Sequence, residues 1–156
     1  MRDRRFVAVH RGGPLTPDQH RWLIRWAQKC AEHALAIAGK EVDRRILDAL
    51  QVASAWENGS ATVGDARNAA FGAIAAAREA REAADPVREA LARSAGHAVA
   101  TAHMADHAPG AADYALRAVK RAGRSPEEER AWQDDRLVPG IRELVLSARE
   151  KKRLKT

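Results

Sequence analysis

Apolar residues recur at helical spacing along almost the whole chain, and the first third shows the pattern most clearly. In "LTPDQHRWLIRWAQKCAEHAL", apolar pairs follow one another at intervals of four residues from Trp22 to Leu35, so they form one stripe along a helix that faces a core. Thr16 is a favourable N-cap, and Pro17 suits the first helical position. The pattern therefore predicts a helix that begins at Pro17 and ends near Gly39, because glycine commonly follows a helix.

The same spacing, with capping residues at its boundaries, predicts helices through the rest of the chain. We expect a second helix over about 42–57, a third over about 63–84, a fourth over about 86–107 that "APG" stops, a fifth in "AADYALRAVKRAG", a sixth from Pro126 and a last in "IRELVLSARE". The fourth carries alanine on nearly every side, as a helix surrounded by neighbours requires. Only "FVAV" resembles a strand. The sequence predicts an all-α fold, a single compact bundle of about seven helices with an alanine-rich central helix.

The net charge of +6 is concentrated at the two ends of the chain. Residues 1–13 carry +3 and residues 149–156 carry +4, which leaves the body close to neutral. We therefore divide the chain into a basic N-terminal extension (1–13), an all-helical domain (14–148) and a basic C-terminal tail (149–156), and we expect both ends to be frayed. Such tails attract polyanions, but the neutral body and the few aromatic residues do not favour nucleic acid as the main partner.

Features that mark a membrane or secreted protein are missing from the sequence. The sequence contains no run of about 18 apolar residues, so it predicts no membrane span. The segment "FVAV" is too short for the apolar core of a secretory signal. Cys30 is the only cysteine, so no disulfide can form within the chain, which suits the reducing cytosol. A chain of 156 residues can bury a core without such a crosslink. We expect a cytoplasmic protein that does not associate with membranes.

Three histidines, His97, His103 and His107, fall within eleven residues of the predicted fourth helix. At about 100° per residue, His103 and His107 share one face, whereas His97 lies about 120° away around the axis. The three are therefore not expected to converge on one ion. The stretch "HMADH" also lacks the glutamate that follows the first histidine in zinc hydrolases. We predict no metal site and regard His103 and His107 as polar points on an otherwise apolar face.

Motifs for catalysis and for phosphate binding are also absent. The sequence contains no G-x-S-x-G elbow, no P-loop and no G-x-G-x-x-G. Cys30 lies within an apolar stripe, which is typical of a buried and unreactive thiol. We predict no catalytic residue, no cofactor and no enzymatic activity. A basic face near the end of the predicted fifth helix complements the helix dipole, and we favour this structural role over phosphate binding; its residues are Arg117, Lys120, Arg121 and Arg124.

Four tryptophans stand out in a chain that is otherwise poor in aromatic residues. Core packing is the simpler role for Trp22 and Trp26, which lie one turn apart on the first predicted helix. Large flat side chains beside alanine can also line an apolar pocket that contains a few polar groups. The candidate ligand-binding residues for such a pocket are Trp22, Trp26, Trp56, His103, His107 and Tyr114.

Four segments resemble a known family in order along the chain: "LTPDQHRWLIRWAQKCAEHAL", "VGDARNAAFGAIAAAREA", "AGHAVATAHMADHAPGAADYALRAV" and "ERAWQDDRLVPGIRELVL". They resemble the bacterial "putative immunity protein" family of small, alanine-rich, all-helical proteins. The resemblance runs from about Leu15 to Leu146. Family members often have a histidine where this chain has Ile74, and "IAGKEVDRRI" is shorter than the corresponding family segment.

The resemblance implies a role in self-resistance. A member of this family is expected to bind and neutralise a toxin made by the same or a neighbouring bacterium, by stoichiometric binding and without catalysis. Two alternatives remain open at this point. The ligand could be a small toxic metabolite or antibiotic held in a cavity lined by tryptophan and histidine, or the basic tails could bind nucleic acid.

Overall fold

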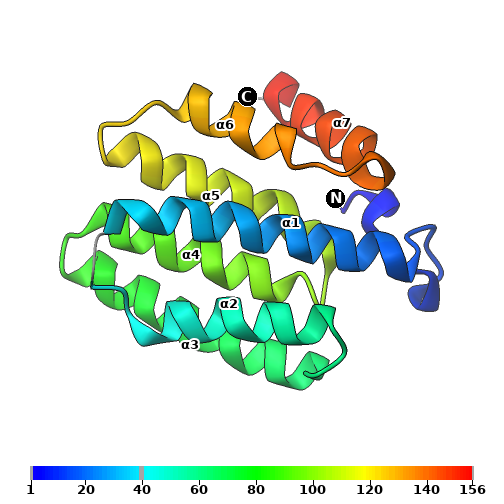
Figure 1. Cartoon of the computed structure of the whole chain (residues 1–156), viewed down its shortest axis with the longest axis horizontal. Helices are drawn as coiled ribbons and strands as arrows, with labels where there is room; N and C mark the ends of the chain where they lie inside the picture. Colours follow the sequence, from blue (N-terminus) through cyan, green and yellow to red (C-terminus); the bar gives the residue numbers. More distant parts are fainter. Residues whose placement is uncertain (1, 39–40, 156) are drawn as a thin grey trace.

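The computed structural model describes residues 2–38 and 41–155, and this part of the chain contains seven α-helices and no strand (Figure 1). The helices are α1 (Pro17–Leu35), α2 (Arg44–Glu57), α3 (Val63–Glu82), α4 (Pro86–Ala100), α5 (Ala108–Arg121), α6 (Pro126–Asp135) and α7 (Pro139–Lys155). Four short 3-10 turns accompany them: η1 (Arg4–Phe6), η2 (Val9–Arg11), η3 (Ala36–Ala38) and η4 (Ala105–His107). The predicted all-α fold is confirmed.

Helix α4 lies at the centre of the bundle. It packs against α1, α2, α3 and α5, and Figure 1 shows α2 and α3 on one side of it and α5, α6 and α7 on the other. Its buried positions are mostly small, including Ala90, Ala95 and Ala98, which are inaccessible to solvent. A Cβ added at Gly96 would lie 3.4 Å from the Cβ of Ala73 on α3. Small side chains therefore set a close approach between these helices.

The helix boundaries follow the capping residues of the sequence. Thr16 and Thr62 each accept a hydrogen bond from the backbone three residues on and form capping boxes, and Ser125 caps α6 in the same way. Helix α2 begins two residues later than expected, because Asp43 is its N-cap. Helix α1 ends at Leu35 and continues as η3; the predicted stop at Gly39 lies outside the described residues.

The predicted end of the fourth helix is wrong. Instead of continuing to His107, α4 ends at Ala100, and a turn and η4 lead to α5. The stretch "APG", expected to stop a helix, instead opens α5, with proline in its first turn, where the missing N–H costs no hydrogen bond. At the break, the carbonyl of the C-cap residue Thr101 accepts a hydrogen bond from His20 Nε2 of α1 (2.6 Å).

The described parts of the two basic segments, 2–13 and 149–155, make contacts with the bundle, in contrast to the expected fraying. Phe6 is 2% exposed, and the Arg5 guanidinium donates a hydrogen bond to Ser147 Oγ of α7 (2.5 Å). Backbone hydrogen bonds join Leu15 to Val7 and Val9. Helix α7 continues to Lys155, and its Arg149 is buried. The termini therefore contribute side chains to the folded surface.

Candidate functional site

The tryptophans are spread over the bundle. Trp26 lies in the core and its Nε1 donates a hydrogen bond to the Gln133 carbonyl of α6 (2.8 Å). Trp22 packs against Gly140, where an added Cβ would overlap its ring. These two indoles share a cavity of only about 50 Å³, far below the roughly 300–1,000 Å³ of ordinary ligand pockets.

The other two tryptophans each pair with a histidine, Trp56 with the buried His20 and Trp132 with His33. The Trp56 ring lies 4.7 Å from the His20 ring and borders a mostly apolar cleft of about 320 Å³ with Val9 and Leu15. Trp132 stacks on His33 at 3.6 Å. The cleft at Trp56 and the small cavity at Trp22 and Trp26 share no lining residue.

The histidines are arranged differently from the expectation, because the predicted helix breaks between them. His97, expected on a separate face, lies beside His107, with 3.1 Å between their Nδ1 atoms. One Nδ1 must therefore be protonated and donate a hydrogen bond to the other. The Tyr114 ring stacks on the His97 ring with 5.1 Å between the ring centres. His103 is not part of this pair, and its buried Nδ1 has no hydrogen-bond partner among the described residues.

Burial holds this histidine pair in the neutral form. Desolvation lowers the pKa of His97 to about 4, with the neighbouring His107 as the next cause. Desolvation also lowers the pKa of His107, partly opposed by Asp106. No group of three or more histidine, cysteine or carboxylate side chains in the described ranges is placed to hold a metal ion. The pair is therefore built as a hydrogen-bonded contact between the α4 and α5 segments.

Alanine at Gly110 is expected to disturb this pair. A Cβ there would lie 2.9 Å from His97 Nδ1, and the His97 ring is confined between His107 and Tyr114. We expect the free energy of unfolding to fall by about 1 kcal/mol, because an overpacking cost of about 1–3 kcal/mol exceeds the gain in helix propensity of about 1 kcal/mol.

Gly72 on α3 is the matched control for this substitution. A Cβ at Gly72 would lie 3.8 Å from the Arg45 side chain, an ordinary contact, so Gly72→Ala is expected to raise the free energy of unfolding by about 0.5–1 kcal/mol. Urea denaturation of both variants measures the difference. Equal stabilisation by the two substitutions would contradict the close packing of Gly110 on His97.

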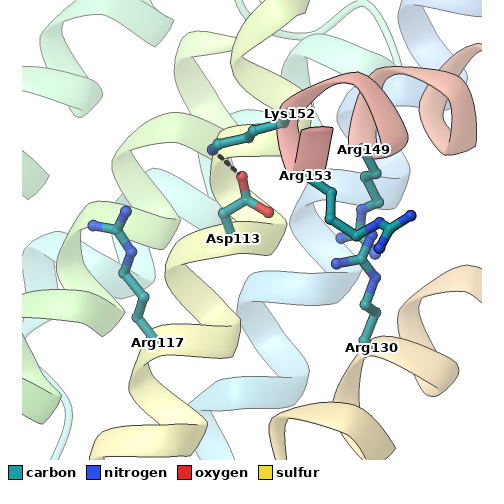
Figure 2. A pocket seen from close by; sticks show the side chains of 6 residues that line it. All are labelled: Asp113, Arg117, Arg130, Arg149, Lys152 and Arg153. Carbon is teal, nitrogen blue, oxygen red and sulfur yellow. Dashed lines mark hydrogen bonds and ion pairs between the residues drawn. The ribbon is translucent and has the colours of Figure 1, made fainter. Parts of the chain in front are cut away.

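A second candidate site is a cleft of about 310 Å³ between α5, α6 and α7, which we call the basic cleft (Figure 2). Its six lining residues are Asp113 and Arg117 from α5, Arg130 from α6, and Arg149, Lys152 and Arg153 from α7. Five of the six are cationic. Figure 2 shows Arg130, Arg149 and Arg153 on one side and Arg117 on the other, with the paired Asp113 and Lys152 between them.

Arg149 is the buried member of the basic cleft, with a side chain that is 3% exposed. Its Nη1 donates to Asp134 (2.8 Å) and its Nη2 to the Gln133 side-chain oxygen (2.6 Å). Its guanidinium also lies 5.2 Å from the centre of the Trp26 ring. The buried Nε has no hydrogen-bond partner among the described residues. Desolvation lowers the pKa of Arg149, and Asp134 opposes this effect.

The other cations of the cleft differ in their partners. Lys152 pairs with Asp113, and Arg153 pairs with Glu150. Within the described ranges, Arg117 and Arg130 form no hydrogen bond or ion pair; Arg117 lies over the Tyr114 ring. Two guanidinium groups of the cleft thus form no direct ion pair, and Arg130 acts on the Glu150 carboxylate only from a distance, by lowering its pKa.

The basic cleft could not be predicted from the sequence because its cations come from three helices that are distant along the chain. The basic face expected on the fifth helix is divided in the structure: Arg117 enters the cleft, whereas Arg121 donates to the Pro86 carbonyl. The spacing of Arg149, Lys152 and Arg153 places them on one helix face, and this signal in the C-terminal segment indicates a shared surface once that segment is recognised as helical.

These features define a small all-α protein with candidate sites in clefts between its helices. The chain belongs to the Imm-5 like putative immunity protein family, whose sequence model matches residues 13–139. This match confirms the resemblance found in the sequence and covers α1 to α6. Neither a curated protein nor a solved structure matches the chain. Over the described residues, no helix combines the length and apolar character needed to cross a membrane.

Proposed function

We propose that this protein is an immunity protein that neutralises a toxin by binding it stoichiometrically, without catalysing a reaction. The observation that carries the proposal is the family match over residues 13–139. Immunity proteins act by occupying a partner, which requires a stable fold that presents a fixed surface. In this proposal the protein acts in the cytoplasm, where Cys30 remains a buried thiol whose pKa is raised by desolvation.

The packing of the bundle supports this mode of action. The core is filled by residues without solvent exposure, such as Leu23, Ile24 and Val99, and the two neighbouring imidazoles of His97 and His107 are hydrogen-bonded to one another. A scaffold of this kind loses little conformational entropy when its surface docks on a partner. The partner in this proposal is a protein toxin.

Growth rescue tests the proposal. Each protein encoded beside this gene is expressed in a host cell with and without the immunity candidate. We expect one neighbour to stop growth and coexpression to restore it, with a purified complex of fixed stoichiometry. The toxin recovered from that complex should have an unchanged mass and regain its activity once separated. Rescue by a substoichiometric amount, or a covalently altered toxin, would contradict neutralisation by binding.

A small toxic molecule is the second candidate ligand, and the Trp56 cleft is the observation that favours it. This cleft of about 320 Å³ is mostly apolar, and its size falls at the lower end of the range for small-molecule pockets. In this alternative, Trp56→Ala abolishes resistance to the molecule, whereas Trp22→Ala on the opposite side of α1 does not. Equal resistance of the two variants would exclude the Trp56 cleft as the binding site.

A further inference from the structure

We propose that the basic cleft is a binding site for a phosphate-type oxyanion carried by a small phosphorylated molecule. The site lies between Arg130, Arg149 and Arg153 on one side and Arg117 on the other (Figure 2). It is separate from the histidine pair and from the Trp56 cleft, which are lined by other residues.

The charge balance of the cleft is the first argument. Three carboxylates, Asp113, Asp134 and Glu150, pair with Lys152, Arg149 and Arg153. Arg117 and Arg130 form no ion pair within residues 2–38 and 41–155, although Arg130 is close enough to lower the pKa of both Glu150 and Arg149. Like charges held together in a concave site raise the local concentration of anions. Two positive charges therefore remain for a ligand to neutralise.

The second argument is the fixed position of Arg149. Its two Nη atoms are held by Asp134 and Gln133, and Gln133 is held in turn by the Ala112 carbonyl (3.1 Å). Three of its five N–H groups remain, and the Nε atom that carries one of them is buried and unpartnered among the described residues. Buried donors are nearly always satisfied in folded proteins. Arg149 lines the cleft, and its guanidinium is already oriented by its two bonds, so its remaining N–H groups are held in a fixed position for a ligand oxygen.

The chemistry of the donors favours phosphate over carboxylate. Guanidinium groups from α5, α6 and α7 approach the cleft from three helices. A phosphate has three terminal oxygens that accept hydrogen bonds from guanidinium groups in several directions, whereas a carboxylate accepts hydrogen bonds within one plane. A phosphate monoester carries about −1.5 to −2 charges at neutral pH, which matches the two unpaired cations. The volume of about 310 Å³ leaves room for a small organic group beside the phosphate.

The site does not follow from membership of the family. Arg149, Lys152 and Arg153 lie beyond residue 139, where the family match ends. The oxyanion site is therefore argued without reference to toxin binding, and either proposal can fail without the other.

Calorimetric titration of the full-length protein tests the site. Inorganic phosphate and pyrophosphate are titrated at pH 7.5, with sodium chloride at matched ionic strength as the reference. We expect saturable binding of pyrophosphate, with phosphate weaker and chloride without saturable heat. Arg130→Gln should weaken pyrophosphate binding about tenfold, which corresponds to one charge-assisted hydrogen bond. Because Arg130 contacts no carboxylate in the described structure, the variant should retain its circular dichroism spectrum and melting temperature.

Two further variants make the outcome decisive. Asp113→Asn removes the competing carboxylate beside Lys152 and should tighten pyrophosphate binding several-fold. Arg78→Gln removes an exposed arginine of α3 and should leave binding unchanged. Equal affinities of the wild type, Arg130→Gln and Arg78→Gln would overturn the proposal. A tetraglutamate peptide that binds more tightly than pyrophosphate and depends on Arg130 would also overturn it and assign the cleft to an acidic protein segment.

Discussion

Replacing Trp26 with alanine is expected to lower the free energy of unfolding by about 3–5 kcal/mol, the range for removing a large buried aromatic side chain. Trp26 is 2% exposed, its indole N–H donates to the Gln133 carbonyl, and Arg149 lies over its ring. The substitution therefore removes apolar contacts, a buried hydrogen bond and a cation–π contact at once. Urea denaturation followed by circular dichroism measures the loss.

Two controls separate these contributions. Trp26→Phe retains an aromatic ring but leaves the Gln133 carbonyl without its donor, and should cost about 1–3 kcal/mol. Trp56→Ala, at a half-buried ring near the surface, should cost less than Trp26→Ala. A loss below about 1 kcal/mol for Trp26→Ala would mean that α6 and α7 do not depend on this ring for their packing.

Acidification from pH 6.5 to pH 4 is expected to destabilise the fold by up to about 3 kcal/mol through His97 alone, at about 1.4 kcal/mol per pKa unit. The folded-state pKa of His97 is lowered to about 4, so between these pH values the unfolded chain binds more protons than the folded one. The contribution of His97 to the free energy of unfolding is fully present above its unfolded-state pKa near 6.5, and it is lost as the pH falls towards 4.

The cause of this loss lies in the surroundings of His97. Burial is the largest effect on its pKa, followed by the positive charge that His107, Arg93 and Lys152 present, while Asp113 opposes them. His97→Asn should flatten the dependence of unfolding free energy on pH between 6.5 and 4. Replacing the exposed His10 with asparagine is the control and should leave that dependence as in the wild type. The same pH profile in wild type and His97→Asn would show that His97 is already protonated in the folded protein.

Most of the fold could be predicted from local sequence signals. Thr16, Thr62 and Ser125 have side chains that cap a helix directly, so the starts of α1, α3 and α6 require no information from distant residues. The end of α4 has no such signal. Alanine-rich sequence continues past Ala100, and Pro109 fits both the stop of one helix and the first turn of the next.

The candidate sites were harder to predict because they depend on the end of α4 at Ala100 and on the packing of α7 against α5. A straight helix separates His97 from His107, but the turn after Ala100 brings their Nδ1 atoms to 3.1 Å. The basic cleft requires α7 to lie across α5, which places Lys152 beside Asp113. Neither contact is local in sequence. The assignments of ligand binding to Trp22, Trp26, Trp56, His103, His107 and Tyr114 stay predictions.

The close approach of α4 to its neighbours has a consequence for how such a protein can diversify. Where Gly96 meets Ala73 and Ser94 Oγ donates to the Ala111 carbonyl (2.7 Å), a larger side chain would push backbones apart. The interior positions of the central helix that meet a neighbouring backbone this closely are thus limited to the smallest residue types. Adaptation to a new partner must occur at solvent-facing positions, which can change freely because the scaffold beneath them does not have to adjust.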